Sequence, residues 1–385
     1  WWVNLFGHAH PHISEAVAQQ AATLEHVILA GFTHEPAVKL AERLLALAGA
    51  PYAKVLYADS GSSAIEIALK LSFHYWRNCG QPARTRFVVL EGGYHGETLG
   101  ALSMTQVPLY RQTYGPLLLD PLVAPAPADG SIAAADAAAD ALDQLLAEHA
   151  ASVCAVLSEP LVQCAAGMRM HHPHFLVRLR EVCSRHRVHW IGDEIAVGFG
   201  RTGTLFAHQQ AGVKPDFLCL AKGLTGGYLP LSAVLTSEPV YQAFYDDYAS
   251  LRAFLHSHSY SGNALACAAA NATLDLLDDP ALMPRIERLG AALEAALHPL
   301  HDHPHATALR RRGLIVAADL VDANGAPWPW QERRGLRVYR HGLDQGALLR
   351  PLGNTVYFMP PYAASEDELR WLAGVAIAGI EIASR

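Results

Sequence analysis

Short apolar runs of β-forming residues recur along the chain, with polar or helix-like segments between them. The clearest runs cover residues 87–90, 153–157, 188–191, 217–220 and 232–236. Each run is too short for a helix and too apolar for a strand with one face in water. The pattern therefore predicts an α/β fold, in which helices cover both faces of a mostly parallel central sheet.

The pattern changes near residue 279. Beyond it we expect a helix over 286–297, an apolar run at 313–321, a strand at 356–359 and a closing helix with one apolar face. At 385 residues the chain is also long for a single compact core. We therefore predict a large domain over residues 1–279 and a smaller α/β domain over 280–385.

Composition narrows the classes of function. The formal net charge is −7 and no run of basic residues occurs, which disfavours nucleic acid or an anionic membrane as partner. Small-molecule substrates are favoured instead. The six cysteines show no CxxC spacing, which favours a reducing cytoplasm. No apolar stretch approaches the length of a membrane span, and the first residues do not resemble a secretion signal.

Lys222 follows the apolar run 217–220 and begins a turn with glycines at 223, 226 and 227. A lysine partly withdrawn from water loses its proton more readily, and the free amine can attack a carbonyl carbon. A structural lysine at the end of a buried strand is the alternative.

Asp193 ends the preceding apolar run, at the edge where parallel sheets bind ligands, and a buried carboxylate there needs a cationic or proton-bearing partner.

Two further segments suggest a bound phosphate and a bound flat ring. Gly61 and Ser62 open a helix-like stretch, where free backbone N–H groups and a hydroxyl would hold a phosphate, although an ordinary helix cap explains them as well. Tyr94 lies among glycines just after the run 87–90, where an aromatic ring could stack on a ligand or simply form a turn. With Lys222 and Asp193, these residues match the needs of pyridoxal 5′-phosphate, whose ring nitrogen an acid keeps protonated.

Other motifs support weaker hypotheses. Glycines at 198, 200 and 203 satisfy the dinucleotide-binding pattern, but two acids separate them from the preceding strand, so a nicotinamide-dependent dehydrogenase is disfavoured. The 21 histidines gather in proline-broken loops without cysteine or repeated acid partners, so we expect no metal site. The turn Ser257-His258-Ser259 precedes a helix-like stretch and offers donors to an anion, or it is only a helix cap.

Taken together, the motifs resemble those of the class III, fold-type I aminotransferases that depend on pyridoxal phosphate, over essentially the whole chain. They are most similar to the members that act in biotin biosynthesis, with S-adenosylmethionine as amino donor and 8-amino-7-oxononanoate as acceptor. The segments that carry the resemblance are Trp1-Trp2, Asp59-Ser60-Gly61-Ser62, Tyr94-His95-Gly96-Glu97, 159–163, 167–170, 193–203, 350–353 and 357–361.

The resemblance implies roles for individual residues. Lys222 would hold the cofactor and move the substrate proton, and Asp193 would pair with the ring nitrogen. The ring would lie between Tyr94 and Ile195, with its phosphate on Gly61 and Ser62. Further residues implied to bind cofactor or substrates are Trp1, Arg201, Ser257, His258, Ser259, Arg350 and Tyr357.

The resemblance also implies a homodimer, in which the turn 257–259 reaches the cofactor phosphate of the neighbouring subunit. Two departures from the family are visible. We expect an N-terminal segment of the small domain to precede Trp1 in relatives, and Ser257-His258 stands where some members carry Gly-Pro. Another class III aminotransferase with an ω-amino or ornithine-like donor is the alternative, and a non-catalytic homologue is disfavoured because the lysine and the acid are both present.

Overall fold

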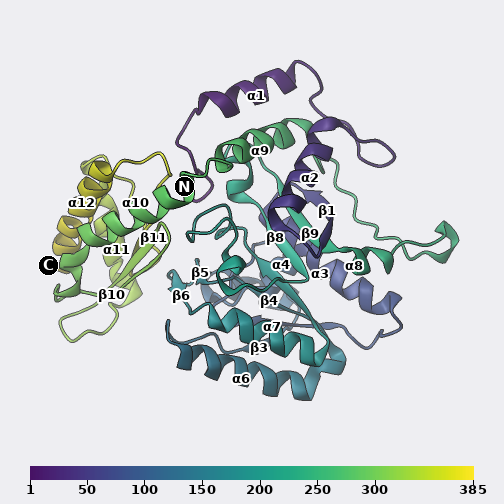
Figure 1. Cartoon of the computed structure of the whole chain (residues 1–385). Helices are drawn as coiled ribbons and strands as arrows, with labels where there is room; N and C mark the ends of the chain where they lie inside the picture. Colours follow the sequence, from purple (N-terminus) through teal and green to yellow (C-terminus); the bar gives the residue numbers. More distant parts are fainter.

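The computed structural model describes all residues from 1 to 385, and its centre is a seven-stranded sheet (Figure 1). The strands lie in the order β1 (Tyr52–Ala58), β9 (Ser232–Ser237), β8 (Phe217–Leu220), β7 (His189–Asp193), β4 (Val153–Ser158), β2 (Arg86–Leu90) and β3 (Leu122–Ala124). Only β9 runs against the others, because it pairs antiparallel with both β1 and β8. The mostly parallel sheet and its five predicted strands are thereby confirmed, whereas β1 and β3 were not predicted.

Helices cover both faces of this sheet, and strand β8 shows why its sequence is apolar throughout. Phe217 and Cys219 pack in one core with helix α3 (Gly61–Asn78). Leu218 and Leu220 point the other way, into a core that includes α2 (Glu35–Ala48) and α9 (Ala264–Leu277). Helices α6 (Ile132–His149) and α7 (His174–His186) cover the same face farther along, over β7 and β4.

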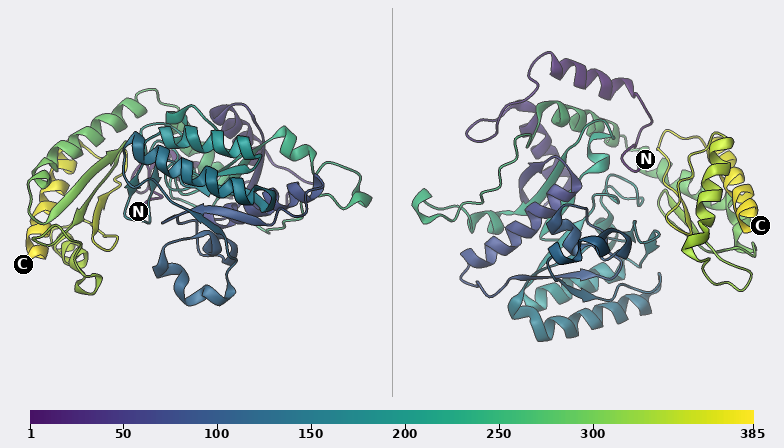
Figure 2. Two further views of the ribbon diagram at one scale, coloured as in Figure 1. Left: turned by 90° about the horizontal axis from the view of Figure 1, so that it is seen from below. Right: turned by 180° about the vertical axis from the view of Figure 1, so that it is seen from behind.

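The C-terminal residues form a second, antiparallel sheet to one side of the first (Figures 1 and 2). Its strands are β10 (Ala306–Arg312), β11 (Ile315–Leu320) and β12 (Thr355–Phe358), and its helices are α10 (Leu282–Ala296), α11 (Arg334–Asp344) and α12 (Glu366–Ser384). Strand β10 was not predicted. One hydrophobic cluster runs from Leu224 to Ile286 and Leu314, so apolar packing joins the two parts, and the boundary at residues 279 and 280 stays a prediction.

The remaining elements are short or peripheral. They are α1 (Pro11–Ala21), α4 (Leu99–Met104), α5 (Pro108–Arg111), α8 (Glu238–Gln242) and the small hairpin of β5 (Val162–Gln163) and β6 (Arg169–Met170). No helix combines the length and the apolar character needed to cross a membrane.

The direction of the strands decides where a ligand can bind. Strands β1, β2, β4, β7 and β8 point the same way, so the loops that follow them meet at one edge of the sheet. This carboxyl edge is where open parallel sheets bind ligands.

Candidate active site

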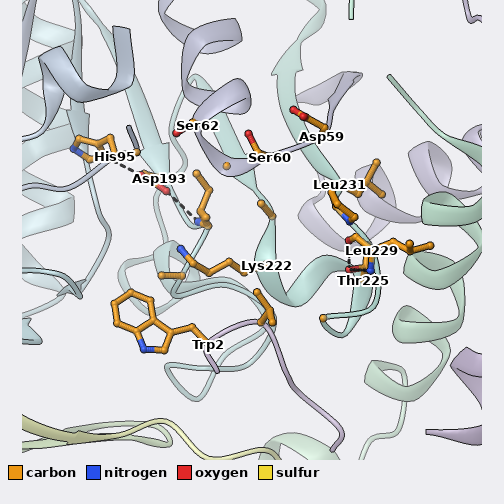
Figure 3. Close-up of a pocket in the computed structure, with 18 of the residues that line it drawn as sticks. Trp2, Asp59, Ser60, Ser62, His95, Asp193, Lys222, Thr225, Leu229 and Leu231 are labelled. Atoms are coloured by element: carbon orange, nitrogen blue, oxygen red, sulfur yellow. Dashed lines mark hydrogen bonds and ion pairs between the residues drawn. The ribbon is translucent and has the colours of Figure 1, made fainter. Parts of the chain in front are cut away.

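A cavity of about 490 Å³ lies at the carboxyl edge of the sheet (Figure 3). It gathers the loops that follow all five of these strands. Its walls contain six residues predicted from the sequence, namely Gly61, Ser62, Tyr94, Asp193, Ile195 and Lys222. Trp2, Asp59, Ser60, His95, Gly96, Glu159 and Thr225 are among the other lining residues.

Lys222 lies two residues beyond the end of β8, in a short 3₁₀ turn over Lys222–Thr225. Its side chain lies between Asp193 and Trp2 (Figure 3), with Nζ 5.4 Å from the centroid of the Trp2 ring. The backbone of Lys222 has φ +43°, in the left-handed region that a residue with a side chain seldom adopts. Such strain concentrates at functional positions, where the surrounding structure holds it in place.

Asp193 is the last residue of β7 and is only 4% exposed. His95 Nδ1 lies 2.7 Å from Oδ2 of Asp193, and the N–H of Ile195 donates to Oδ1 at 3.1 Å. Because a carboxylate can only accept, His95 carries the proton on Nδ1 when Asp193 is charged. The two donors supply the partners that a buried carboxylate requires.

The start of α3 forms another wall of the cavity. Ser60 caps this helix, because its Oγ accepts the N–H of Ser63 at 3.2 Å. The following residues, Gly61 and Ser62, carry N–H groups of the first turn, where a helix binds phosphate well. A Cβ on Gly61 would lie 2.9 Å from the Ile195 side chain, so glycine keeps this approach open.

The loop after β2 closes over Ser62. The N–H of Glu97 donates to Ser62 Oγ at 3.0 Å. A Cβ on Gly96 would lie 1.9 Å from the same Oγ, and the φ of Gly96 is +127°, so only glycine fits here. The Tyr94 hydroxyl donates to Glu97 at 2.8 Å, and burial together with this contact raises the pKa of the Tyr94 phenol.

A second cavity of about 280 Å³ adjoins the first, and Trp2 lies in the walls of both. It contains the predicted residues Trp1, Arg350 and Tyr357. The Trp1 and Trp2 rings are stacked with centroids 5.7 Å apart, and the Arg350 guanidinium lies 4.6 Å from the centre of the Trp1 ring. Trp2 Nε1 donates to the Tyr357 hydroxyl at 2.8 Å.

Arg201, predicted to help bind the amino donor, lines neither cavity. It is 1% exposed, and its guanidinium donates to the backbone carbonyls of Trp2 at 3.1 Å, Asn4 at 2.6 Å and Pro360 at 2.7 Å. The position of Arg201 therefore does not support a direct contact between its guanidinium and the amino donor. Arg201 instead ties the N-terminal residues to the segment after β12.

The turn 257–259 also lies outside both cavities of its own chain. His258 Nε2 is 3.2 Å from Oδ2 of Asp59, which lines the first cavity, while Ser257 and Ser259 are exposed. The predicted contact of this turn with a neighbouring subunit stays a prediction.

Sequence reasoning did not assign roles to Trp2, His95, Glu159 and Thr225, all of which line the first cavity. His95 follows Tyr94 directly, and Glu159 is the first residue after β4. The expectation that chemistry gathers at strand ends could have identified both. The glycines at 198, 200 and 203 lie in a loop that no α-helix follows, unlike a dinucleotide-binding turn.

These side chains fit pyridoxal 5′-phosphate. The cavity combines a lysine amine, a buried carboxylate, the N-terminus of a long helix kept open by glycine, and an aromatic ring beside a branched aliphatic side chain. In the same order, these groups supply covalent attachment, pairing with the ring nitrogen, phosphate binding and contact with the ring.

Comparison with known proteins places the chain in a family. The family model described as Aminotransferase class-III matches residues 1–377, and the chain belongs to this family. Its cofactor is pyridoxal 5′-phosphate.

Named relatives define the comparison further. The chain is 45% identical to adenosylmethionine-8-amino-7-oxononanoate aminotransferase of Helicobacter pylori, over 99% of this chain and 85% of that protein. The crystal structure of the protein of that name from Methanocaldococcus jannaschii has a TM-score of 0.94 at 33% identity, covering 99% of this chain and 87% of that one. A PLP-bound amine transaminase from an uncultivated Pseudomonas species has a TM-score of 0.91 at 34% identity, covering 100% and 88%.

Proposed function

We propose that this chain transfers an amino group from S-adenosylmethionine to 8-amino-7-oxononanoate, a step of biotin biosynthesis. Relatives that carry this activity in their names are up to 45% identical over nearly the whole chain. The observation that carries the proposal is the position of Arg350. It borders a mostly apolar cavity that meets the Lys222 cavity at Trp2.

This arrangement suits a long-chain oxo acid. In 8-amino-7-oxononanoate the reacting ketone and the carboxylate are separated by a run of methylene groups. The guanidinium of Arg350 can bind the carboxylate, the tryptophan pair can cover the methylene groups, and the ketone then lies toward Lys222. Because the two tryptophan rings lie between Arg350 and Lys222, we expect a short acceptor to engage only one of these two residues.

Bound pyridoxal phosphate supplies a carbonyl that condenses with amines and a ring that accepts electrons. The residues of this chain hold and orient it. Gly61 and Ser62 would bind its phosphate, and Tyr94 and Ile195 would contact its ring. Asp193, oriented by the His95 N–H, holds the proton of the ring nitrogen.

Lys222 performs the proton transfer. Its Nζ lies just beyond the end of β8, and as a free amine it would take the proton from the donor carbon. It returns a proton to the oxo carbon of the acceptor in the second half of the reaction.

We also propose that the active unit is a homodimer. Large apolar side chains are highly exposed in two segments, 105–120 and 243–262, and the most exposed are Leu109 at 84%, Tyr248 at 89% and Leu255 at 80%. A monomer seldom leaves such groups in water. The turn 257–259 lies in the second segment. A Leu255→Arg variant should shift the mass measured by light scattering from dimer to monomer.

The proposed compartment is the cytoplasm. All six cysteines are free, and five of them are buried, as expected of a protein in a reducing environment.

A second candidate is transfer from a simple amine, which the likeness to amine transaminases favours. One experiment separates the two. Purified holoenzyme is mixed with S-adenosylmethionine alone, and the visible absorbance of the bound cofactor is followed, with a simple primary amine in a parallel cuvette. We expect a change with S-adenosylmethionine. A change with the simple amine only would refute the proposed donor.

The acceptor is tested in the second half of the reaction. After removal of the donor, 8-amino-7-oxononanoate should restore the original absorbance and yield the diamino acid by mass spectrometry. A shorter oxo acid serves as the comparison, because we expect it to engage only one of Arg350 and Lys222.

A further inference from the structure

Glu159 is a buried acid in the wall of the first cavity that the reaction described above does not use. It is the first residue after β4 and is 5% exposed. Its Oε2 accepts the N–H of Tyr94 at 3.0 Å, and its Oε1 accepts the N–H of Cys164 at 3.1 Å. One carboxyl group therefore joins the loop after β2 to the loop after β4.

No lysine or arginine pairs with this carboxyl group. Burial raises the pKa of Glu159 to about 7, with the nearby charge of Asp193 adding to the rise, while His95 and the two N–H donors oppose it. A buried carboxyl without a cationic partner is costly. A purely structural link between two loops could use a neutral side chain, so an acid at this position calls for an explanation.

We explain the acid by its contact with the backbone of Tyr94. Tyr94 lines the cavity, and its ring is fixed at two further points, by the hydroxyl contact to Glu97 and by edge contact with Tyr110 at 5.0 Å between centroids. The Glu159 contact fixes the backbone from which this ring projects. The next residue, His95, is the one that contacts Asp193. A shift of the Tyr94 amide would therefore move both the ring and the partner of the buried acid.

We propose that Glu159 is a positioning residue that acts through the Tyr94 amide. By holding this amide it sets the place of the Tyr94 ring and of His95, and so determines how firmly and in what orientation the pyridoxal phosphate ring is held. This deepens the proposed function, because it rests on the assignment of this cavity to the cofactor.

The chain offers a matched control. Glu66 also uses its carboxylate to accept backbone N–H groups, from Gly100 at 2.8 Å and Ala101 at 3.1 Å, but it does not line the cavity. Glu66→Gln therefore reports the general effect of weakening a carboxylate that binds two amides.

The experiment measures cofactor binding without any substrate. Apoenzymes of the unaltered protein, Glu159→Ala, Glu159→Gln and Glu66→Gln are titrated with pyridoxal phosphate, and the circular dichroism of the bound cofactor is recorded in its absorption band. We expect Glu159→Ala to weaken binding at least tenfold and to reduce the dichroism of each bound cofactor. Glu159→Gln should show a smaller change in the same direction, because its amide oxygen can still accept one N–H.

Clear outcomes overturn the inference. The first such outcome is a folded Glu159→Ala variant whose cofactor affinity and dichroism equal those of the unaltered protein. The second is a loss of cofactor affinity and dichroism in Glu66→Gln that is as large as the loss in Glu159→Ala. If Glu159→Ala does not fold, Glu159→Gln decides by the same two measurements. Since no amino donor is present, the result is independent of which substrates the enzyme uses, and a wrong choice of donor would not imitate it.

Discussion

His95 and Asp193 form a buried pair at the carboxyl edge of the central sheet, with Nδ1 and Oδ2 2.7 Å apart and both side chains almost fully withdrawn from water (Figure 3). The other ring nitrogen of His95 is buried and has no hydrogen-bond partner. The imidazole therefore makes its only polar side-chain contact with the acid.

Replacing His95 by Phe should weaken both cofactor binding and turnover. Asp193 would keep only the Ile195 N–H, and losing one hydrogen bond to a charged group costs about 10- to 100-fold in equilibrium. His95→Asn, which can still donate an N–H, should recover part of the loss. Titration with pyridoxal phosphate and single-turnover kinetics measure the two effects, and unchanged values for His95→Phe would contradict this role.

Lys222→Ala should abolish steady turnover. Removing the group that moves the proton costs about 10²- to 10⁴-fold in rate. The donor half of the reaction, followed by stopped-flow absorbance, measures it. Lys214→Ala is the control, because Lys214 contacts the carbonyls of Ala48 and Ala50 and lies outside the cavity. A normal rate in Lys222→Ala would refute the proposed mechanism.

Gly96→Ala should destabilise the protein and disturb the wall around Ser62. The new Cβ would fall 1.9 Å from Ser62 Oγ, and the backbone would keep an unfavourable φ. We expect a loss of about 1–3 kcal/mol in the free energy of unfolding, measured by urea denaturation. In Gly130→Ala the added Cβ meets nothing within 4 Å, so its stability should stay close to that of the unaltered protein.

Glu159 should make the free energy of unfolding fall as pH rises. Its pKa is about 7 in the folded protein and near 4.5 in the unfolded chain, so the folded state binds more protons between these values. Stability is then lost from about pH 4.5 to pH 7, by about 3 kcal/mol in total. The groups that surround Glu159 are His95, Asp193 and the Cys164 thiol.

This effect is isolated by measuring the free energy of unfolding against pH for two proteins, the unaltered protein and Glu159→Gln. His171 and His189 are buried with pKa values of about 4, below their ordinary value, so they make stability fall as pH drops below about 6.5. This loss of stability at low pH should occur in both the unaltered protein and Glu159→Gln. The decline between about pH 4.5 and pH 7 that belongs to Glu159 should be absent from Glu159→Gln, and parallel profiles would show that the carboxyl does not titrate in this range.

Arg350→Leu should raise the KM for 8-amino-7-oxononanoate by about 10- to 100-fold, as expected for the loss of a charged contact. The half reaction with S-adenosylmethionine alone should keep its rate. Arg370, exposed on α12 and paired with Glu366, provides the control substitution Arg370→Leu. An equal rise in KM for the control, or no rise for Arg350→Leu, would argue against acceptor binding at this position.

The sequence predicted the strands whose residues are almost all buried, including the edge strand β12, and it missed the edge strands β1, β3 and β10. β8 is apolar at every position and β4 at every position but its last, Ser158, and both strands are buried throughout, so their pattern is unambiguous. β1 lies at one edge with its middle residues half-exposed, β3 has only three residues, and β10 ends in three arginines. The reversed direction of β9 could not be predicted, because apolar pattern carries no information on strand polarity.

The site was predicted where chemistry depends on residue type and was missed where it depends on backbone placement. Lys222, Asp193 and Tyr94 carry unusual side chains for their positions. Glu159 contacts main-chain amides, and only its place directly after β4 could have indicated a role for it. Arg201 was expected to help bind the donor because the family resemblance implied it, whereas its guanidinium donates mainly to backbone carbonyls inside the protein.

The indole of Trp2 is a common wall of the first cavity and of the second cavity, in which we propose that the acceptor binds. Shrinking it to admit a bulkier acceptor would also remove the surface beside the Lys222 amine, so the substrate range of this enzyme cannot be widened there without loosening the reaction centre. Arg350 and Tyr357 both line the second cavity and not the first, but Tyr357 accepts the N–H of Trp2 and so is tied to the shared wall. On the proposed function, Arg350 is therefore the position at which selection, natural or in the laboratory, can change the acceptor with the least effect on the first cavity.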